Sequence, residues 1–171
     1  MERKNIITFK GNPLTLVGSE LKVGDTAPDF TACDAGLQPV KLSNFKGQSV
    51  IISAVPSLDT PVCEIQTKKF NQEASSLKAK VLTVSVDLPF AQKRFCDSFK
   101  IQNVSVLSDY KDHDFANKYG LYIKELGLIS RAVIVVNAEG KISHFEIVKE
   151  VTQEPNYQAA IDKVKSTVGV A

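Results

Sequence analysis

The side chains with the greatest capacity for chemistry in this chain are three cysteines, Cys33, Cys63 and Cys96. No two of them are spaced as C-x-x-C, and the two histidines, His113 and His144, lie far in sequence from any cysteine pair. The ligand spacing of a structural zinc site is therefore missing, and no metal is expected. Three cysteines are also too few for a disulfide-rich secreted scaffold. They are either inert packing residues or redox-active thiols in a reducing compartment.

Cys63 lies where a helix is predicted to follow a buried strand. Thr60 is a favourable N-cap residue and Pro61 suits the first helical position, so Cys63 becomes the third residue of the helix. Backbone N–H groups in that turn have no intrahelical acceptor, and the helix end carries about half a positive charge. Both features stabilise a thiolate, which is the nucleophilic form of cysteine. We interpret Cys63 as a reactive thiol. The alternative is a small apolar residue packed beneath the helix.

The elements that must position Cys63 follow from the hydrophobic pattern. Continuous apolar runs at 49–55 and 80–86 predict strands buried on both faces, and right-handed crossovers make them parallel neighbours. An N-terminal hairpin is expected, with its turn at Gly11-Asn12-Pro13. The other elements are expected as strands at 30–33, 40–42, 104–107, 131–137 and 141–148 and as helices at 61–77, 90–99, 115–119 and 157–168. This order predicts one α/β domain over 1–171 with a mixed central sheet flanked by helices. It resembles the thioredoxin-like architecture with an added N-terminal β-hairpin.

Helical spacing also predicts which side chains reach the core. The first long helix should bury Val62, Ile65, Phe70, Ala74 and Leu77. In the second, Phe90, Ala91, Phe95 and Phe99 form the apolar set, and the three phenylalanines are interpreted as core residues. Outside these helices, Cys33 is expected to be a buried bystander, and His113 and His144 are expected at the surface.

The same residues carry a family resemblance. Pro56, Thr60 and Cys63 reproduce the P-x-x-x-T-x-x-C signature of the peroxiredoxins. The string from Pro56 to Cys63 is similar to the thiol peroxidase subfamily in particular. Three further blocks share that similarity, namely Asp87-Leu88-Pro89-Phe90-Ala91-Gln92 leading to Arg94-Phe95-Cys96, then Arg131-Ala132-Val133, and finally Glu154-Pro155-Asn156-Tyr157. The resemblance covers essentially the whole chain.

The resemblance implies a role for each matching residue. Cys63 would be the peroxidatic cysteine, which attacks the terminal oxygen of a hydroperoxide and becomes a sulfenic acid. The Thr60 hydroxyl would cap the helix and hydrogen-bond the thiolate or peroxide, and Pro56 would shape the pocket and exclude water. Cys96 would be the resolving cysteine that closes an intrachain disulfide. A disulfide requires Cα atoms within roughly 7 Å, so local unwinding around both cysteines is expected on oxidation. The alternative for Cys96 is plain packing among Phe95 and Phe99.

A cation is needed to complete this site, and Arg131 is the candidate. It opens a strand expected to run antiparallel to 49–55, which places it beside the carboxyl end of that strand. A guanidinium there could hold the thiolate and the peroxide oxygens together and stabilise charge on the leaving oxygen. The alternative is a solvated arginine at a strand edge.

The function implied is a thiol-dependent peroxidase that reduces hydrogen peroxide and alkyl hydroperoxides and is recycled by thioredoxin. The resemblance also implies a homodimer. No cofactor is expected, because the sulfur carries the redox chemistry. A disulfide oxidoreductase of the same fold is disfavoured by the missing C-x-x-C. A redox-sensing or binding module, which would oxidise once and stop, is the alternative from another class.

Composition excludes several other classes. The net charge of the 171 residues is +2, and no basic block exceeds the pairs Lys68-Lys69 and Lys93-Arg94, so no nucleic-acid partner is expected. The longest purely apolar run, 132–136, is far shorter than the roughly 20 residues that span a bilayer. No apolar segment of a secretory signal follows the charged N-terminus. We therefore expect a cytoplasmic protein without a membrane contact.

Overall fold

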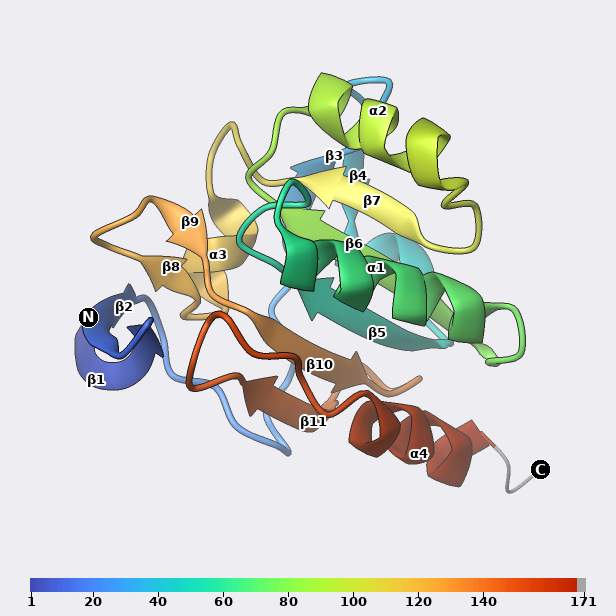
Figure 1. Cartoon of the computed structure of the whole chain (residues 1–171). Coiled ribbons are helices and arrows are strands. Elements are labelled where there is room, and N and C mark those ends of the chain that lie inside the picture. Colours follow the sequence, from blue (N-terminus) through green and yellow to red (C-terminus); the bar gives the residue numbers. More distant parts are fainter. Residues whose placement is uncertain (169–171) are drawn as a thin grey trace.

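The computed structural model describes residues 1–168 and contains a seven-stranded mixed sheet. The order across it is β11-β10-β5-β6-β7-β3-β4 (Figure 1). The bounds are β3 (Thr31–Cys33), β4 (Pro39–Lys41), β5 (Ser49–Ala54), β6 (Ala79–Ser85), β7 (Ser105–Ser108), β10 (Ala132–Val136) and β11 (Ile142–Ile147). The predicted parallel pairing of β5 with β6 is confirmed, and β10 lies antiparallel to β5 on its other side. Every residue of β5 and β10 is buried, because helices cover both faces of the sheet.

The helices divide between the two faces of this sheet. One face is covered by α1 (Pro61–Ala74), α2 (Pro89–Phe99) and α4 (Tyr157–Val168), which lie in front of the strands in Figure 1. The other face packs against the 3-10 helix η1 (Leu42–Phe45) and the short α3 (Asp114–Lys118). Alternate residues of β5 point to opposite faces. Ile51 therefore packs in the core on the side of α1, α2 and α4, and Ile52 packs in the core on the side of η1 and α3. The predicted fold class, a mixed sheet flanked by helices, is confirmed.

The predicted N-terminal hairpin is present but belongs to a second, four-stranded sheet. Its order is β1 (Glu2–Phe9), β2 (Asn12–Val17), β8 (Tyr122–Ile123) and β9 (Leu128–Ile129). The turn was predicted at 11–13, whereas the structure places it at Lys10 and Gly11, which both have positive φ, and includes Pro13 in β2. Two consecutive left-handed residues form the tight turn that suits the strand twist. The strands β8 and β9 were not predicted, because two residues are too short to show an alternating pattern.

Two predicted helix faces are correct only in part: Phe70 of α1 and Phe95 of α2 are buried as expected, but other members are not. The inner face of α1 consists of Cys63, Gln66, Thr67 and Phe70, while Ile65 is 48% exposed. The helix also ends at Ala74, before Leu77. In α2 only Phe95 of the three phenylalanines is buried; Phe90 is 67% and Phe99 39% exposed. In both helices a glutamine shares the inner face and binds other buried polar groups, so hydrophobicity alone identified only part of that face.

Three expectations about single residues also need correction. Cys33 is half-buried in β3, not fully buried, and its partial burial raises the pKa of its thiol. His113 and His144 are half-buried, not at the surface. The Nε2 atom of His144 is buried without a hydrogen-bond partner, and burial lowers the pKa of its imidazole. The strand β11 carries this histidine at the edge of the sheet, and α4 packs against the same strand.

Across residues 1–168, no helix combines the length and the apolar character needed to cross a membrane. The same residues contain no group of three or more His, Cys, Asp and Glu side chains that could hold a metal ion.

Candidate active site

The loop that leaves the carboxyl end of β5 leads into α1 (Figure 1), and Cys63 lies in the first turn of that helix. Thr60 occupies the N-cap position with extended backbone angles, and its carbonyl oxygen accepts the first helical hydrogen bond, from the Glu64 N–H at 3.0 Å. Pro61 is the first helical residue, so Cys63 is the third. The local chain therefore has the predicted form. Pro56 is buried in this loop, and Leu58 is 3% exposed.

The expected side-chain cap by Thr60 is absent from this helix start. The Thr60 hydroxyl instead donates a hydrogen bond to the carbonyl oxygen of Ser57 at 3.1 Å, and the helix N-terminus has no side-chain cap. The proton of the hydroxyl is thus committed to the loop, which tightens the turn between Ser57 and Thr60. N-terminal N–H groups of α1 are left without a capping oxygen, and they contribute to the positive potential at this end of the helix.

Arg131 lies directly against the sulfur of Cys63. Its Nη2 atom is 3.2 Å from Cys63 Sγ, although the two residues are 68 positions apart in the chain. The register of β10 against β5 explains this approach, because Ala132 pairs with Ala54, the last residue of β5. Arg131 is therefore brought to the strand end from which the Cys63 loop departs. Both side chains are buried: Cys63 has no exposed surface and Arg131 is 2% exposed.

The guanidinium is held by three acceptors. Besides the sulfur, its Nε donates to the Val151 carbonyl oxygen at 2.8 Å and its Nη1 donates to Gln66 Oε1 at 2.9 Å. Gln66 is fully buried and its Nε2 donates to Ser53 Oγ at 2.7 Å, which fixes the amide in this orientation. No carboxylate lies within ion-pair distance of Arg131 in the part of the chain that the structure describes.

Two features of this arrangement place positive charge next to the sulfur. A buried cation is costly unless an opposite charge or good hydrogen bonds compensate it. The acceptors Gln66 Oε1 and Val151 O are neutral, so the Cys63 sulfur is the contacting atom of Arg131 that can become an anion. The amino-terminal end of α1 adds a favourable potential from the other side. The guanidinium and the helix end therefore both direct positive potential at the sulfur and at the space beside it.

Tyr157 closes the site from the start of α4. Its ring meets Phe70 edge to face, with 5.4 Å between centroids, and its hydroxyl donates to Glu154 Oε1 at 2.8 Å. Burial, followed by the hydrogen bond to Glu154, raises the pKa of the Tyr157 hydroxyl. The phenol is therefore a neutral wall of the site at physiological pH.

Cys96 is a free thiol in the third turn of α2. It is half-buried and packs against the same apolar cluster that contains Cys63, Phe70 and Phe95. Burial raises the pKa of the Cys96 thiol, and the neighbouring Asp97 carboxylate adds to this increase. Cys63 in α1 and Cys96 in α2 therefore contact the same apolar cluster, and both are free thiols.

Sequence reasoning missed three groups that shape the site. Gln66 and the Val151 carbonyl orient Arg131, and Asp87 binds the loop before Cys63. Gln66 lies three residues after Cys63 and therefore on the same helix face, a spacing that could have identified it. The Val151 carbonyl left no such signal, because its position depends on how the chain after β11 folds back.

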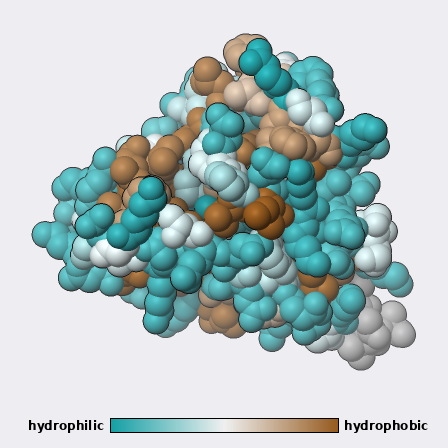
Figure 2. All heavy atoms as spheres, in the orientation of Figure 1, coloured by the Kyte–Doolittle hydropathy of each residue, from teal (hydrophilic) through white to brown (hydrophobic). Residues whose placement is uncertain are grey.

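A cavity of about 350 Å³ opens beside the site, between the loop at Leu58 and Asp59 and the helix α2. It is lined by Leu58, Asp59, Asp87, Ala91, Arg94, Phe95, Ser98 and Phe99. Figure 2 shows apolar surface over α2 at the top of the view, among hydrophilic neighbours. The exposed apolar side chains of this helix region are Leu88, Phe90 and Phe99.

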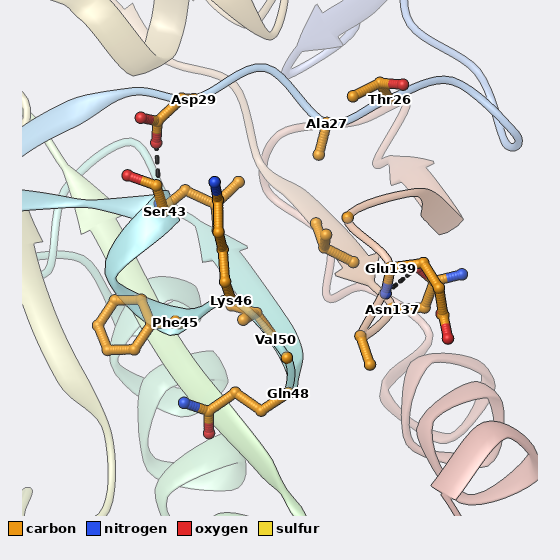
Figure 3. Close-up of a pocket in the computed structure, with 15 residues that line it drawn as sticks. Thr26, Ala27, Asp29, Ser43, Phe45, Lys46, Gln48, Val50, Asn137 and Glu139 are labelled. Atoms are coloured by element: carbon orange, nitrogen blue, oxygen red, sulfur yellow. Dashed lines mark hydrogen bonds between the residues drawn. The ribbon is translucent and has the colours of Figure 1, made fainter.

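A second cavity of about 300 Å³ lies at the other end of the sheet (Figure 3). Val50 and Val136 form part of its wall and pair with each other at the end of β5 and β10 remote from Cys63. In Figure 3, Lys46 and Gln48 stand on one side of this cavity and Asn137 and Glu139 on the other. It therefore contributes no group to the cysteine site.

Comparison with known proteins agrees with this geometry. A family model described as Redoxin matches residues 22–161. The chain is 51% identical to the thiol peroxidase of Halalkalibacterium halodurans over 163 residues, which cover 95% of this chain and 98% of that protein. It is 49% identical to the thiol peroxidase of Bacillus subtilis over 163 residues, with the same coverage of both chains.

Solved structures show the same relationship. The crystal structure of a peroxiredoxin-like protein from Aquifex aeolicus superposes with a TM-score of 0.91 at 47% identity, over 97% of this chain and 98% of that one. A thiol peroxidase from Chromobacterium violaceum shares the fold with a TM-score of 0.87 at 20% identity, over 96% and 98% of the two chains. The chain therefore belongs to the redoxin family and, within it, to the thiol peroxidases, which are thiol-dependent enzymes of the peroxiredoxin type.

Proposed function

We propose that Cys63 is the peroxidatic cysteine, that Cys96 resolves it through an intrachain disulfide, and that thioredoxin restores both thiols. Hydrogen peroxide and alkyl hydroperoxides are the proposed substrates. The observation that carries the proposal is the buried Arg131 guanidinium, 3.2 Å from Cys63 Sγ and without a carboxylate partner among residues 1–168. Such a cation stabilises a thiolate before the reaction and a departing oxyanion during it.

The first step transfers one oxygen to sulfur. The Cys63 thiolate attacks the terminal oxygen of the hydroperoxide, a sulfur–oxygen bond forms and the oxygen–oxygen bond breaks. The departing alkoxide or hydroxide takes a proton and leaves as alcohol or water, and the two electrons lost by sulfur reduce the peroxide. Arg131 lies where it can bind both the sulfur and the peroxide oxygens. Pro56, buried in the loop, supports the proposed exclusion of water.

Substrate entry requires movement, because Cys63 has no exposed surface. We propose that a small opening over the sulfur admits the peroxide while the contact between Arg131 and Cys63 is kept. Thr60 donates to the Ser57 carbonyl; its oxygen retains lone pairs that can accept a hydrogen bond from a hydroperoxide. We propose this acceptor role in place of the side-chain cap.

The second step converts the sulfenic acid of Cys63 into a disulfide. The Cys96 thiolate attacks the sulfenic sulfur of Cys63, a disulfide forms, and the sulfenic oxygen leaves as hydroxide, which takes a proton and becomes water. A dithiol protein of the thioredoxin type then reduces the disulfide by two electrons and is itself oxidised. The common apolar cluster of the two cysteines supports this pairing. We propose a homodimer located in the cytoplasm, where thiol reductants are present.

The test is turnover with thioredoxin, its reductase and NADPH. The wild-type protein should consume peroxide in many cycles. Cys63→Ser should abolish even the first turnover, while Cys96→Ser should retain the first turnover and lose the thioredoxin-driven cycle. A single oxidation without turnover would identify a redox sensor instead. Steady cycling by Cys96→Ser would show that Cys96 is not the resolving cysteine. Cys33→Ser serves as the control and should cycle like the wild type.

A further inference from the structure

Asp87 lies between β6 and α2 and binds the loop that leads to Cys63. One of its carboxylate oxygens accepts a hydrogen bond from Ser57 Oγ at 2.7 Å. The other accepts one from the backbone N–H of Leu58, also at 2.7 Å. Asp87 is half-buried, so these short bonds are partly shielded from water. Hydrogen bonds to an ionised carboxylate are among the stronger ones in proteins.

The same carboxylate is anchored to the sheet and to α2. Its second oxygen also accepts from Ser85 Oγ at 2.7 Å, at the end of β6. The Ser85 hydroxyl in turn accepts a hydrogen bond from Gln92 Nε2 at 3.0 Å, and Gln92 is buried on the inner face of α2. The backbone of Asp87 leads directly into Leu88, the N-cap of α2, and its carbonyl oxygen accepts from Ser108 Oγ. One carboxylate therefore joins the Cys63 loop to the base of the Cys96 helix.

These bonds exist only while the loop is packed against the start of α2. Any displacement that carries Ser57 and Leu58 away from Asp87 breaks both of their hydrogen bonds. The packed state is also the one in which Arg131 contacts the Cys63 sulfur. The carboxylate thus lowers the free energy of the closed site relative to any state with a displaced loop. Loop displacement during resolution therefore works against these two bonds.

We propose that Asp87 is a positioning residue that holds the closed, peroxide-reducing state and must release the loop before Cys63 and Cys96 can join. The proposal rests on the function assigned above to the two cysteines. It predicts opposite effects on the two chemical steps. Losing the carboxylate weakens the placement of Cys63 against Arg131, which slows attack on peroxide. The same loss makes the loop easier to displace, which speeds disulfide formation.

The test uses Asp87→Ala and Asp87→Asn in the full chain, mixed rapidly with hydrogen peroxide and quenched. The chain contains no tryptophan, so the thiol, sulfenic, disulfide and sulfinic forms are separated by intact mass after alkylation. For Asp87→Ala we expect about a tenfold slower first step and about a tenfold faster disulfide step, from the loss of one or two charge-assisted hydrogen bonds. Asp87→Asn, whose side-chain oxygen can still accept from Leu58, should fall between alanine and wild type.

The yield of sulfinic acid gives an independent readout. Sulfinic acid forms when a second peroxide reaches the sulfenic acid before Cys96 does. Faster resolution in Asp87→Ala should therefore lower the sulfinic fraction at high peroxide. Asp34→Ala is the matched control, because the Asp34 carboxylate also binds a loop, by accepting hydrogen bonds from the backbone N–H groups of Gly36 and Gln38 in an exposed turn. It should leave both steps unchanged.

Each outcome decides the matter. If both steps slow together in Asp87→Ala and Asp87→Asn, the residue is merely structural and the inference is wrong. If neither step changes more than about twofold, the carboxylate does not hold the loop. If Asp87→Ala fails to fold, the asparagine variant alone gives the comparison of the two steps. A wild-type protein that does not consume peroxide would instead overturn the proposed function.

Discussion

Replacing Arg131 by methionine removes the positive charge from the site while keeping a long side chain. At the observed 3.2 Å and an effective dielectric constant of about 20, a guanidinium and a thiolate attract each other by about 5 kcal/mol. Burial of both groups offsets much of this gross attraction. The net loss is better judged from donors that stabilise a developing oxyanion, whose removal slows reactions about 100-fold to 1000-fold. We expect the second-order rate constant for peroxide to fall by that factor in Arg131→Met.

The assay is the first turnover of the reduced protein with hydrogen peroxide, measured by rapid quench and intact mass. Arg131→Lys is the matched control for charge. A lysine ammonium keeps the positive charge but lacks the planar fork that reaches Gln66 Oε1, Val151 O and the sulfur together. Its rate should therefore lie between those of the wild type and Arg131→Met. Thermal unfolding of each variant shows whether the fold is retained.

A result within about threefold of wild type for Arg131→Met would refute the reasoning, since 100-fold is the smallest loss that removal of such a donor predicts. A large loss shared equally by the lysine variant would show that hydrogen-bond geometry, and not charge, carries the effect. Unfolding of both variants would be explained by the acceptors left without a donor, which cost about 1–3 kcal/mol each. In that case Gln66→Met, which frees one arm of the guanidinium, supplies the comparison.

Three further predictions follow from burial, backbone geometry and pKa. Phe95→Ala should lower the free energy of unfolding by about 3 kcal/mol, whereas exposed Phe90→Ala should change it by less than about 0.5 kcal/mol; denaturant titration measures both. Gly120 has φ +66°, and an added Cβ would clash with the Ser19 carbonyl oxygen, so Gly120→Ala should lower the melting temperature by several degrees, at a cost of about 1–3 kcal/mol. Hydrogen bonds from Thr152 and neighbouring groups lower the pKa of Glu150 from 4.5 to about 2. Its stabilising contribution is therefore complete above pH 4.5 and lost as the pH falls toward 2, so Glu150→Gln should flatten the melting temperature over this range.

Local chain preferences were readable from the sequence alone. The predicted strand at 49–55 begins with β5 and ends one residue after it, and the predicted strand at 80–86 is shifted by one residue from β6. The pattern Thr60, Pro61, Cys63 placed the cysteine in the first turn of α1, as the structure shows. These features depend on backbone preferences over a few residues and on strands buried from both sides. Such preferences act within a short stretch of chain and leave a clear pattern.

The errors arose where polar side chains serve the interior. Gln66 and Gln92 occupy the inner faces of α1 and α2 and bind Arg131 and Ser85. A hydrophobic pattern assigns glutamine to the solvent side, so it placed Ile65 inside. The two-residue strands and the partial burial of the histidines were not predicted for a related reason. Tertiary contacts, and not the neighbouring sequence, determine the surroundings of these residues.

The sequence by itself determined the fold class, the family and the helix start that carries Cys63, because each depends on nearby residues or on an ordered set of motifs. Only the tertiary structure decided what surrounds the sulfur. The register of β10 on β5 brings Arg131 to Cys63, and the chain beyond β11 supplies the Val151 carbonyl that orients it. These partners are separated from Cys63 by more than 60 positions. No local preference encodes such a distance, since strand pairing and helix packing across the whole sheet must first bring the segments together.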